Sequence, residues 1–206
     1  MTVAIIDYGV GNLFSLASSL RYLGVEAKVT ADAAELRAAE RLILPGVGAF
    51  GDAAAKLRQS GLFTVVQEQA AAGKPLLGIC LGMQLLFERS FEYGEHQGLG
   101  LIAGIVQDLQ PDLLDKSLKT PHIGWNSLHI LRPDPLFKYF QDGEYVYYVH
   151  SYYAKDCAAS TLAVSDYSLP VTGVVRSSEG AVWGVQFHPE KSGAAGLRLL
   201  RAFAEI

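Results

Sequence analysis

The stretch Lys74-Pro-Leu-Leu-Gly-Ile-Cys-Leu-Gly-Met-Gln-Leu-Leu-Phe87 decides the fold class. Residues 74–79 form a short apolar run of the kind found in buried strands, and a helical segment from about Leu81 to Phe87 follows it directly. Glycines at 78 and 82 flank Cys80, which is the G-x-nucleophile-x-G pattern of a sharp strand-to-helix turn. The stretch therefore predicts a sheet strand, a tight turn that carries a cysteine, and a helix.

Toward the N-terminus, the same strand–helix alternation repeats. Asn12 is a good helix N-cap and Gly24 a good helix stop, and a break is expected near Gly61. The predicted strands cover residues 3–6, 26–30 and 41–44, and the predicted helices cover 13–23, 32–39 and 50–72. Such alternation predicts a parallel sheet with helices on both faces.

The second half of the chain is richer in strands. They are expected over residues 101–109, 122–131, 145–154, 161–165, 172–176 and 182–187, before a final helix over 192–204. We expect mixed pairing there. The predicted fold class is α/β, with a mostly parallel central sheet, an antiparallel annex and a single domain over residues 1–206.

Composition excludes several classes of function. The net charge is −4, from 17 basic and 21 acidic residues, and no basic stripe exists, so neither nucleic acid nor an anionic membrane is an expected partner. Residues 2–7 lack a basic leader, and the longest apolar run, 75–87, is too short to span a bilayer. With only two cysteines, we expect a cytoplasmic protein, and we expect neither a metal ion nor a cofactor.

Cys80 is the candidate nucleophile. The helix after it directs free N–H groups and a positive dipole end at the sulfur, which favours the thiolate. The amide of Leu81 is then placed to help bind an oxyanion. The alternative is a buried structural cysteine, because cysteine is among the most buried residue types. Cys157 has no comparable surroundings.

His188 is the candidate general base. Among five histidines, only His188 both ends an apolar strand and has a carboxylate, Glu190, two residues on. Pro189 stiffens this link, so Glu190 can hold one imidazole nitrogen while the other faces the sulfur. Both Cys80 and His188 follow strands, and sites in parallel sheets lie at the carboxyl ends of strands.

These residues resemble the class I (triad) glutamine amidotransferases, which pair a cysteine on a Gly-x-Cys-x-Gly turn with a distal His-Pro-Glu. The resemblance covers essentially the whole chain. Further motifs narrow it to the glutaminase subunits of imidazole glycerol phosphate synthases, from histidine biosynthesis. These are residues 5–12, 45–50, 78–87, Pro121-His-Ile-Gly-Trp-Asn126 and Tyr148-Val-His-Ser-Tyr-Tyr153.

The resemblance implies that Cys80 attacks the side-chain amide of glutamine, that His188 moves the protons and that Glu190 holds His188. It implies an oxyanion hole built from Leu81 and an amide of the loop 45–48, near Val47 or Gly48. Substrate contacts are implied for Gln84, Glu92, His150, Ser151 and Tyr152, with Glu92 facing the ammonium group. A solvated Glu92, structural roles for His150 and Tyr152, and an ordinary glycine turn at 45–48 stay open.

The resemblance also implies a partner, a separate cyclase subunit with a (β/α)8 barrel that forms a heterodimer with this chain. The barrel would receive ammonia and convert PRFAR to imidazole glycerol phosphate and AICAR. Asn12, Trp125, Tyr147 and Lys191 match positions that face this partner. Trp125 as a core residue and Lys191 as a plain surface residue are the alternatives.

Three other functions stay open at this point. The first is a glutaminase that serves another acceptor, as in anthranilate or pyridoxal phosphate synthesis, which the motifs at 121–126 and 148–153 disfavour. The second is a cysteine hydrolase of non-glutamine substrates. The third is a non-catalytic module that keeps the fold, against which the intact Cys80, His188 and Glu190 argue.

Overall fold

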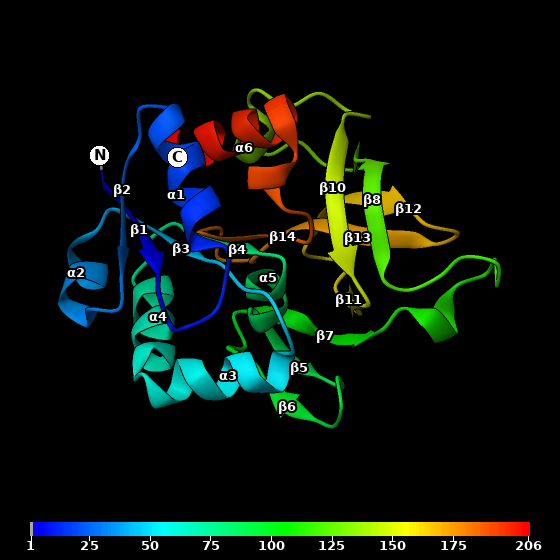
Figure 1. Ribbon diagram of the computed structural model, residues 1–206, viewed down its shortest axis with the longest axis horizontal. Helices are drawn as coiled ribbons and strands as arrows, with labels where there is room; N and C mark the ends of the chain where they lie inside the picture. Colours follow the sequence, from blue (N-terminus) through cyan, green and yellow to red (C-terminus); the bar gives the residue numbers. More distant parts are fainter. Residues whose placement is uncertain (1) are drawn as a thin grey trace.

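The computed structural model describes residues 2–206, so Met1 of the predicted domain lies outside the described residues. An eight-stranded sheet runs through the middle of the molecule (Figure 1). Five of its strands pair in parallel in the order β2, β1, β3, β4 and β14. They span Glu26–Thr30, Thr2–Ile6, Arg41–Leu44, Leu76–Ile79 and Val182–Val185, respectively.

Beyond β14 the same sheet continues with antiparallel strands. They are β13 (Pro170–Arg176), β12 (Thr161–Asp166) and the short β9 (His129–Ile130). The predicted α/β class, with a parallel core and an antiparallel annex, is confirmed.

Two smaller sheets flank the large one. A two-stranded antiparallel sheet joins β10 (Tyr145–His150) to β8 (His122–Ser127). A four-stranded sheet has the order β11, β7, β5, β6, with the bounds Tyr152–Lys155, Ile102–Asp108, Phe87–Ser90 and His96–Gln97.

Helices cover both faces of the large sheet, as predicted (Figure 1). On one face, α1 (Leu13–Tyr22) and α6 (Gly193–Glu205) bury leucines and Phe203 against the strands. The other face is covered by α2 (Ala33–Ala38), α3 (Phe50–Gln59), α4 (Leu62–Ala71) and α5 (Leu81–Leu85). Three 3-10 turns span Gln110–Asp112, Pro135–Phe137 and Pro189–Lys191.

Local sequence signals fix the helix ends. The Asn12 side chain accepts a hydrogen bond from the Ser15 N–H at 3.4 Å, so Asn12 is the N-cap of α1. Gly24, just after α1, and Gly61, between α3 and α4, have φ of +73° and +76°. Only glycine adopts such angles at little cost, which explains why these helices end there.

Three predicted boundaries were wrong. The helix expected up to Phe87 ends at Leu85, because Phe87 already pairs with Ile102 in β5, a strand that the prediction missed along with β6. The expected strand 145–154 breaks at Ser151, where the chain leaves the β8 sheet and joins β7. The expected strand 122–131 breaks at Leu128, since β8 and β9 belong to different sheets.

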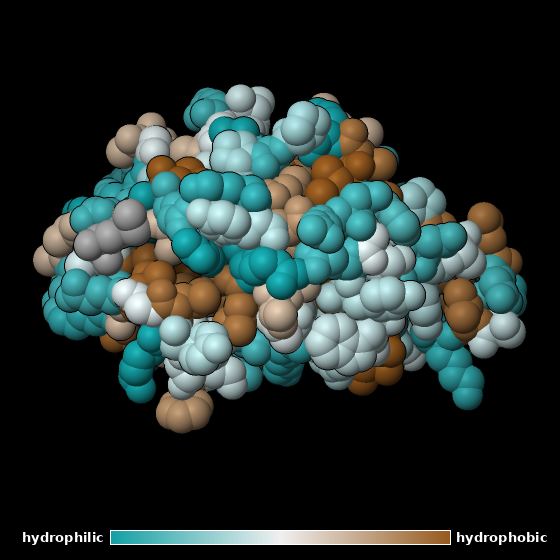
Figure 2. All heavy atoms as spheres, turned by 90° about the horizontal axis from the view of Figure 1, so that it is seen from above, coloured by the Kyte–Doolittle hydropathy of each residue, from teal (hydrophilic) through white to brown (hydrophobic). Residues whose placement is uncertain are grey.

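The surface seen from above is largely hydrophilic (Figure 2). It shows several separate apolar patches among polar residues. Within residues 2–206, no helix combines the length and the apolar character that crossing a bilayer requires.

Candidate active site

Cys80 occupies the turn between β4 and α5. Its backbone angles, φ 54° and ψ −110°, are rare for a residue other than glycine, so this turn is strained. The Cys80 N–H donates a hydrogen bond to the Val185 carbonyl at 2.8 Å, which ties the turn to β14. The predicted strand–turn–helix context of the cysteine is therefore present.

Three glycines make this turn possible. A Cβ at Gly82 would overlap the Leu44 carbonyl oxygen, and one at Gly78 would lie 2.7 Å from the Gly82 oxygen. A Cβ at Gly46 would lie 2.9 Å from the Gly82 nitrogen. The loop after β3 therefore packs directly on the start of α5, and both glycines of the Gly-x-Cys-x-Gly motif are required by close backbone contacts.

His188 lies beside Cys80 because β14 and β4 are parallel neighbours in register. The His188 Nδ1 is 2.8 Å from Glu190 Oε1, and both side chains are 3% exposed. The other nitrogen, Nε2, is buried and has no hydrogen-bond partner among residues 2–206, which leaves it for the reacting groups. Catalytic hydrogen bonds are often long in unliganded sites and tighten in the complex.

The charge state of His188 follows from its neighbours. Burial alone would lower its pKa, but the Cys80 side chain and the Glu190 carboxylate outweigh burial and raise the pKa of His188 to about 9. At neutral pH the imidazole is therefore protonated when it faces the cysteine. A protonated imidazole can give a proton to a leaving group.

A cavity of about 310 Å³ opens over Cys80 and His188. The residues that line it are Val47, Gly48, Cys80, Leu81, Gln84, Glu92, Val149, His150, Tyr152, His188 and Lys191. All of them except Val149 were singled out from the sequence. Ser151, also predicted, is not among them; its carbonyl accepts from the Leu109 N–H at 2.9 Å. A cavity of this size suits a small polar molecule.

The loop 45–48 forms one wall of this cavity. Tyr8 holds it from behind, because its hydroxyl donates to the Pro45 carbonyl at 2.8 Å. Gly48 has φ +97° and Val47 is 42% exposed. The loop is thus anchored at its base, while Val47 and Gly48 at its tip line the cavity together with Leu81 at the start of α5.

Glu92 both caps a helix and lines the cavity. Its Oε2 accepts a hydrogen bond from the Phe50 N–H at 2.6 Å, so it caps α3, whose own N-cap residue, Ala49, has no side-chain acceptor. Burial raises the pKa of Glu92, and the Phe50 hydrogen bond only partly offsets this rise. The reading of Glu92 as a merely solvated surface residue was therefore wrong, since the carboxylate is half-buried and held at the cavity wall.

Gln84 lies fully inside the site. Its Nε2 donates to the Tyr152 carbonyl at 2.9 Å and to Gln186 Oε1 at 3.0 Å. Gln186 in turn has its Nε2 3.7 Å from Cys80 Sγ. Gln186 was not predicted as a site residue, although it stands only two residues before His188, just after the end of β14.

Two histidines form a buried pair next to the cavity. His150 Nδ1 is 2.9 Å from the Tyr152 carbonyl, and its Nε2 is 3.1 Å from His122 Nδ1. Burial lowers the pKa of His122 to about 4, and burial, followed by His122, lowers that of His150 to about 3. Both rings are neutral at pH 7. His122 was not predicted, although it lies in the quoted motif 121–126.

Of the residues predicted to face a partner, Trp125 and Tyr147 lie on the β8–β10 sheet, Lys191 lies beside it in the 3-10 turn Pro189–Lys191, and Asn12 caps α1. The Trp125 ring packs edge-on against Tyr147 at 6.0 Å, and the Lys191 ammonium lies 6.0 Å from the centre of the Tyr147 ring. Trp125 is 55% exposed, so the alternative of a core tryptophan is wrong. Ile123 and Tyr145, 60% and 61% exposed, lie on the same face by register.

Among residues 2–206, no group of three or more histidine, cysteine, aspartate or glutamate side chains is arranged to hold a metal ion. Both cysteines are free thiols. The placement of Cys80 beside His188, which contacts Glu190, can support nucleophilic attack by the cysteine.

The chain is similar to known proteins over nearly its full length. The family model described as glutamine amidotransferase class-I matches residues 4–205. "Imidazole glycerol phosphate synthase subunit HisH" of Listeria monocytogenes is 48% identical over 204 residues, covering 99% of this chain and 95% of the relative. The protein of the same name from Bacillus cereus is 50% identical over 205 residues, covering 99% and 94%.

Solved structures agree on the fold. The structure of PurLQS from Thermotoga maritima superposes with a TM-score of 0.77 at 21% identity, covering 99% of this chain and 97% of that chain. A structure described as a glutamine amidotransferase superposes with a TM-score of 0.75 at 22% identity, covering 98% and 97%.

Proposed function

This chain belongs to the class-I glutamine amidotransferase family, and from that membership we propose that it is the glutaminase subunit of an imidazole glycerol phosphate synthase. In this role it hydrolyses glutamine to glutamate and ammonia for histidine biosynthesis in the cytoplasm. The observation that carries the proposal is that Cys80 and His188 line one cavity of about 310 Å³, with Glu190 in contact with the far nitrogen of His188.

The first half of the reaction breaks the amide. The Cys80 thiolate attacks the side-chain amide carbon of glutamine, and the negative charge moves to the amide oxygen. The Leu81 N–H and an N–H of the loop near Val47 or Gly48 stabilise that oxyanion. The His188 imidazolium gives its Nε2 proton to the amide nitrogen, which leaves as ammonia, and a thioester to Cys80 remains.

The second half releases glutamate. His188 Nε2, now neutral, takes a proton from water as the water oxygen attacks the thioester carbon. The carbon–sulfur bond then breaks, glutamate leaves, and the thiolate–imidazolium pair is restored. Glu190 keeps Nδ1 protonated throughout through its 2.8 Å contact, so that Nε2 is always the nitrogen that exchanges the proton.

The substrate is an amino acid zwitterion, and the cavity offers complementary groups. Glu92 supplies a negative charge for the ammonium group, and Lys191 supplies a positive charge at the same cavity. Gln84, His150 and Tyr152 line the remainder, where they would hold the side chain between the nucleophile and the oxyanion donors.

The ammonia needs a protected acceptor, because protonation in water would destroy its nucleophilicity. The word subunit in the relatives' name supports a complex. The exposed face of Ile123, Trp125, Tyr145 and Tyr147 supports a docking surface, since aromatic anchors dominate interfaces. Val149 of β10 belongs to this face by register and lines the cavity as well.

We propose that a cyclase subunit with a (β/α)8 barrel covers this face, together with Asn12 and Lys191, and converts PRFAR to imidazole glycerol phosphate and AICAR with the ammonia. The open tip of the loop 45–48 suggests that the oxyanion hole is completed only in the complex. The isolated chain would then hydrolyse glutamine slowly, since one missing oxyanion donor costs about 10²–10³ in rate.

The test measures glutamate release by the chain alone, with the cyclase subunit, and with the subunit and its ribonucleotide. Cys80→Ala should abolish release in all three, whereas the matched variant Cys157→Ala should retain it, because Cys157 is buried outside the cavity. The Cys80→Ala complex should still make product from added ammonium. Glutamate release by Cys80→Ala at the wild-type rate would contradict the mechanism.

A further inference from the structure

Gln186 is a fully buried amide beside the nucleophile, with 0% of its surface exposed. We propose, on the basis of the function proposed above, that Gln186 is a further catalytic residue that donates a hydrogen bond from its side-chain amide to the Cys80 sulfur. It would hold the thiolate in place and stabilise its charge.

The orientation of the Gln186 amide is set by its surroundings. The Tyr152 carbonyl can only accept, so the Gln84 group 2.9 Å from it must be the NH₂ group. That NH₂ group also lies 3.0 Å from the Gln186 side chain, which must therefore turn its oxygen toward Gln84. The remaining end of Gln186, its own NH₂ group, is left 3.7 Å from Cys80 Sγ, within hydrogen-bonding distance of sulfur.

The hydrogen bonds of Asn126, His122 and His150 lead to the same Tyr152 carbonyl and can be assigned in the same way. Asn126 Nδ2 donates to the Asp166 carbonyl at 2.8 Å and faces His122 Nε2 at 3.4 Å. His122 can then donate from Nδ1 to His150 Nε2, and His150 from Nδ1 to the second lone pair of the Tyr152 carbonyl. Two backbone carbonyls thus anchor a network in which the last donor points at the sulfur.

A purely structural role explains this arrangement less well. A buried amide needs partners for both ends, and Gln84 satisfies only the oxygen of Gln186. The Gln186 NH₂ group has the Cys80 sulfur as its hydrogen-bond partner, and a thiolate is a far better acceptor than a thiol. The contact is therefore most favourable in the charged form that attacks the substrate.

Gln186 differs from the titratable neighbours of the sulfur in being a neutral hydrogen-bond donor. It therefore stabilises the thiolate without being able to take its proton. The groups that carry or exchange protons near Cys80 are Tyr8 behind the loop 45–48, His150, His188, Glu190, and Glu92 and Lys191 across the cavity. None of these contributes a fixed neutral donor in contact with Sγ.

The experiment follows the pH dependence of Cys80 alkylation by iodoacetamide in the full chain, by mass spectrometry. Gln186→Met removes the donor at similar size, and Gln186→Glu keeps an oxygen for Gln84 but places a carboxylate near the sulfur. We expect the midpoint of the pH profile to rise by about 1–2 pH units in Gln186→Met, the size of a lost hydrogen bond to a charged group. Gln186→Glu should shift it at least as far.

Thr172→Val is the matched control. Thr172 is buried and donates to the Ala154 carbonyl at 3.2 Å, so this variant also loses a buried hydrogen bond, but away from the cavity. Its alkylation profile should match the wild type. The variants' glutaminase assay in the complex should show a lower kcat with a smaller change in KM.

Wild-type profiles in both Gln186 variants would overturn the inference, as would an equal shift in Thr172→Val. These results are distinct from a failure of the proposed function. That failure would show as an unreactive Cys80 in the wild-type chain, or as glutamate release by Cys80→Ala, and neither depends on Gln186.

Discussion

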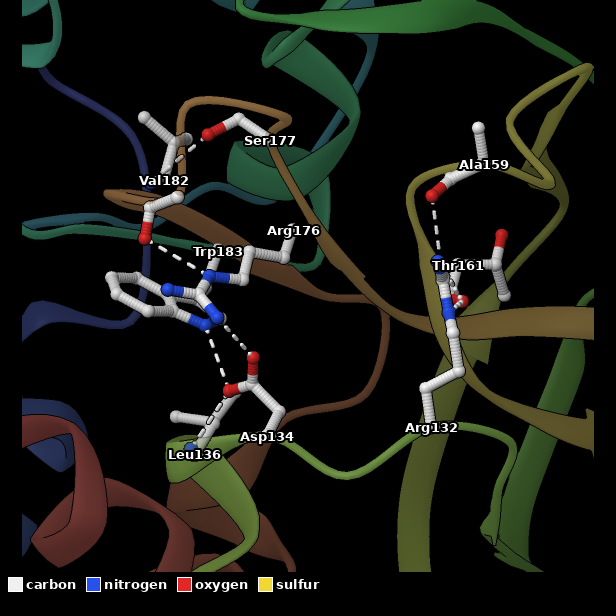
Figure 3. Close-up of polar contacts among 10 residues, drawn as sticks. Arg132, Asp134, Leu136, Ala159, Thr161, Arg176, Ser177, Val182 and Trp183 are labelled. Carbon is white, nitrogen blue, oxygen red and sulfur yellow. Dashed lines mark hydrogen bonds and ion pairs between the residues drawn. The ribbon is translucent and has the colours of Figure 1, made fainter.

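Asp134 is a buried carboxylate that contacts residues of β13 and β14, and it does not line the cavity. Its side chain is 1% exposed and accepts from Trp183 Nε1 at 3.0 Å, from the Leu136 N–H at 2.8 Å and from Arg176 Nη1 at 2.8 Å. Figure 3 shows the Arg176 guanidinium stacked over the indole while both groups point at this carboxylate. Trp183 lies on β14, the strand that leads to His188.

We expect Asp134→Ala to lower the free energy of unfolding by about 2–4 kcal/mol. The Trp183 N–H, buried with its ring, would lose its partner, which costs about 1–3 kcal/mol. Loss of the cap on the turn at Leu136 adds about 1 kcal/mol. Arg176 is a third exposed and can turn to water, so its ion pair adds at most about 1 kcal/mol. The alanine variant no longer has to bury a carboxylate, and this gain keeps the total loss toward the lower end of the range.

Urea unfolding followed by tryptophan fluorescence measures this change. The same substitution in a Trp183→Phe background isolates the indole contribution, and its cost there should be smaller by about 1–2 kcal/mol. The slope of the unfolding free energy with urea should not change. A cost below about 0.5 kcal/mol, or an equal cost in both backgrounds, would refute the assignment of the indole hydrogen bond.

Three further predictions concern the site and its surroundings. His122 and His150 have folded-state pKa values of about 4 and 3, below the unfolded value, so the free energy of unfolding should be unaffected by them above about pH 6.5 and should fall by about 1.4 kcal/mol per pH unit for each as the pH drops toward 4. In His122→Phe only one of the two histidines remains, so urea unfolding at several pH values should show a smaller dependence of the unfolding free energy on pH; an unchanged dependence would contradict this. Cys80 should react with iodoacetamide much faster than Cys157, which bonds to threonine hydroxyls in the core, and a glutamine analogue should protect only Cys80; equal labelling on mass spectrometry would count against the site. Trp125→Ala should weaken binding of the cyclase subunit by at least tenfold in calorimetry while leaving the unfolding free energy within about 0.5 kcal/mol, and unchanged affinity would remove Trp125 from the interface.

The first half of the fold could be predicted because each of its elements has its own signal. Apolar runs mark the buried strands, and Asn12, Gly24 and Gly61 mark helix ends. The second half was harder because its strands exchange sheets. At Ser151 the alternation of more and less buried residues is interrupted, because the chain passes from β10 to β11. No residue type at this position indicates that the two strands pair with different neighbours. Phe87 ends an apolar run that does not reveal where the helix stops.

The site was predictable where chemistry restricts the residue type. Cys80, with glycines that cannot carry a Cβ, and His188, with Glu190 two residues on, are visible without coordinates. Gln186 and His122 were not, since a buried amide and a neutral imidazole become meaningful only when their partners are known. Those partners lie up to 106 residues away in the sequence.

A ring of hydrogen bonds joins the proposed docking face to His188. The His188 N–H donates to the Tyr147 carbonyl at 2.9 Å, and the Tyr147 N–H donates to Ser192 Oγ at 3.0 Å. Ser192 Oγ returns a hydrogen bond to the His188 carbonyl at 2.6 Å, which closes a ring of contacts. Trp125, across from Tyr147 in the β8–β10 pair, presses on the same residue. These hydrogen bonds tie the backbone that carries His188 to the exposed β8–β10 pair, whereas close glycine contacts pack the turn that carries Cys80.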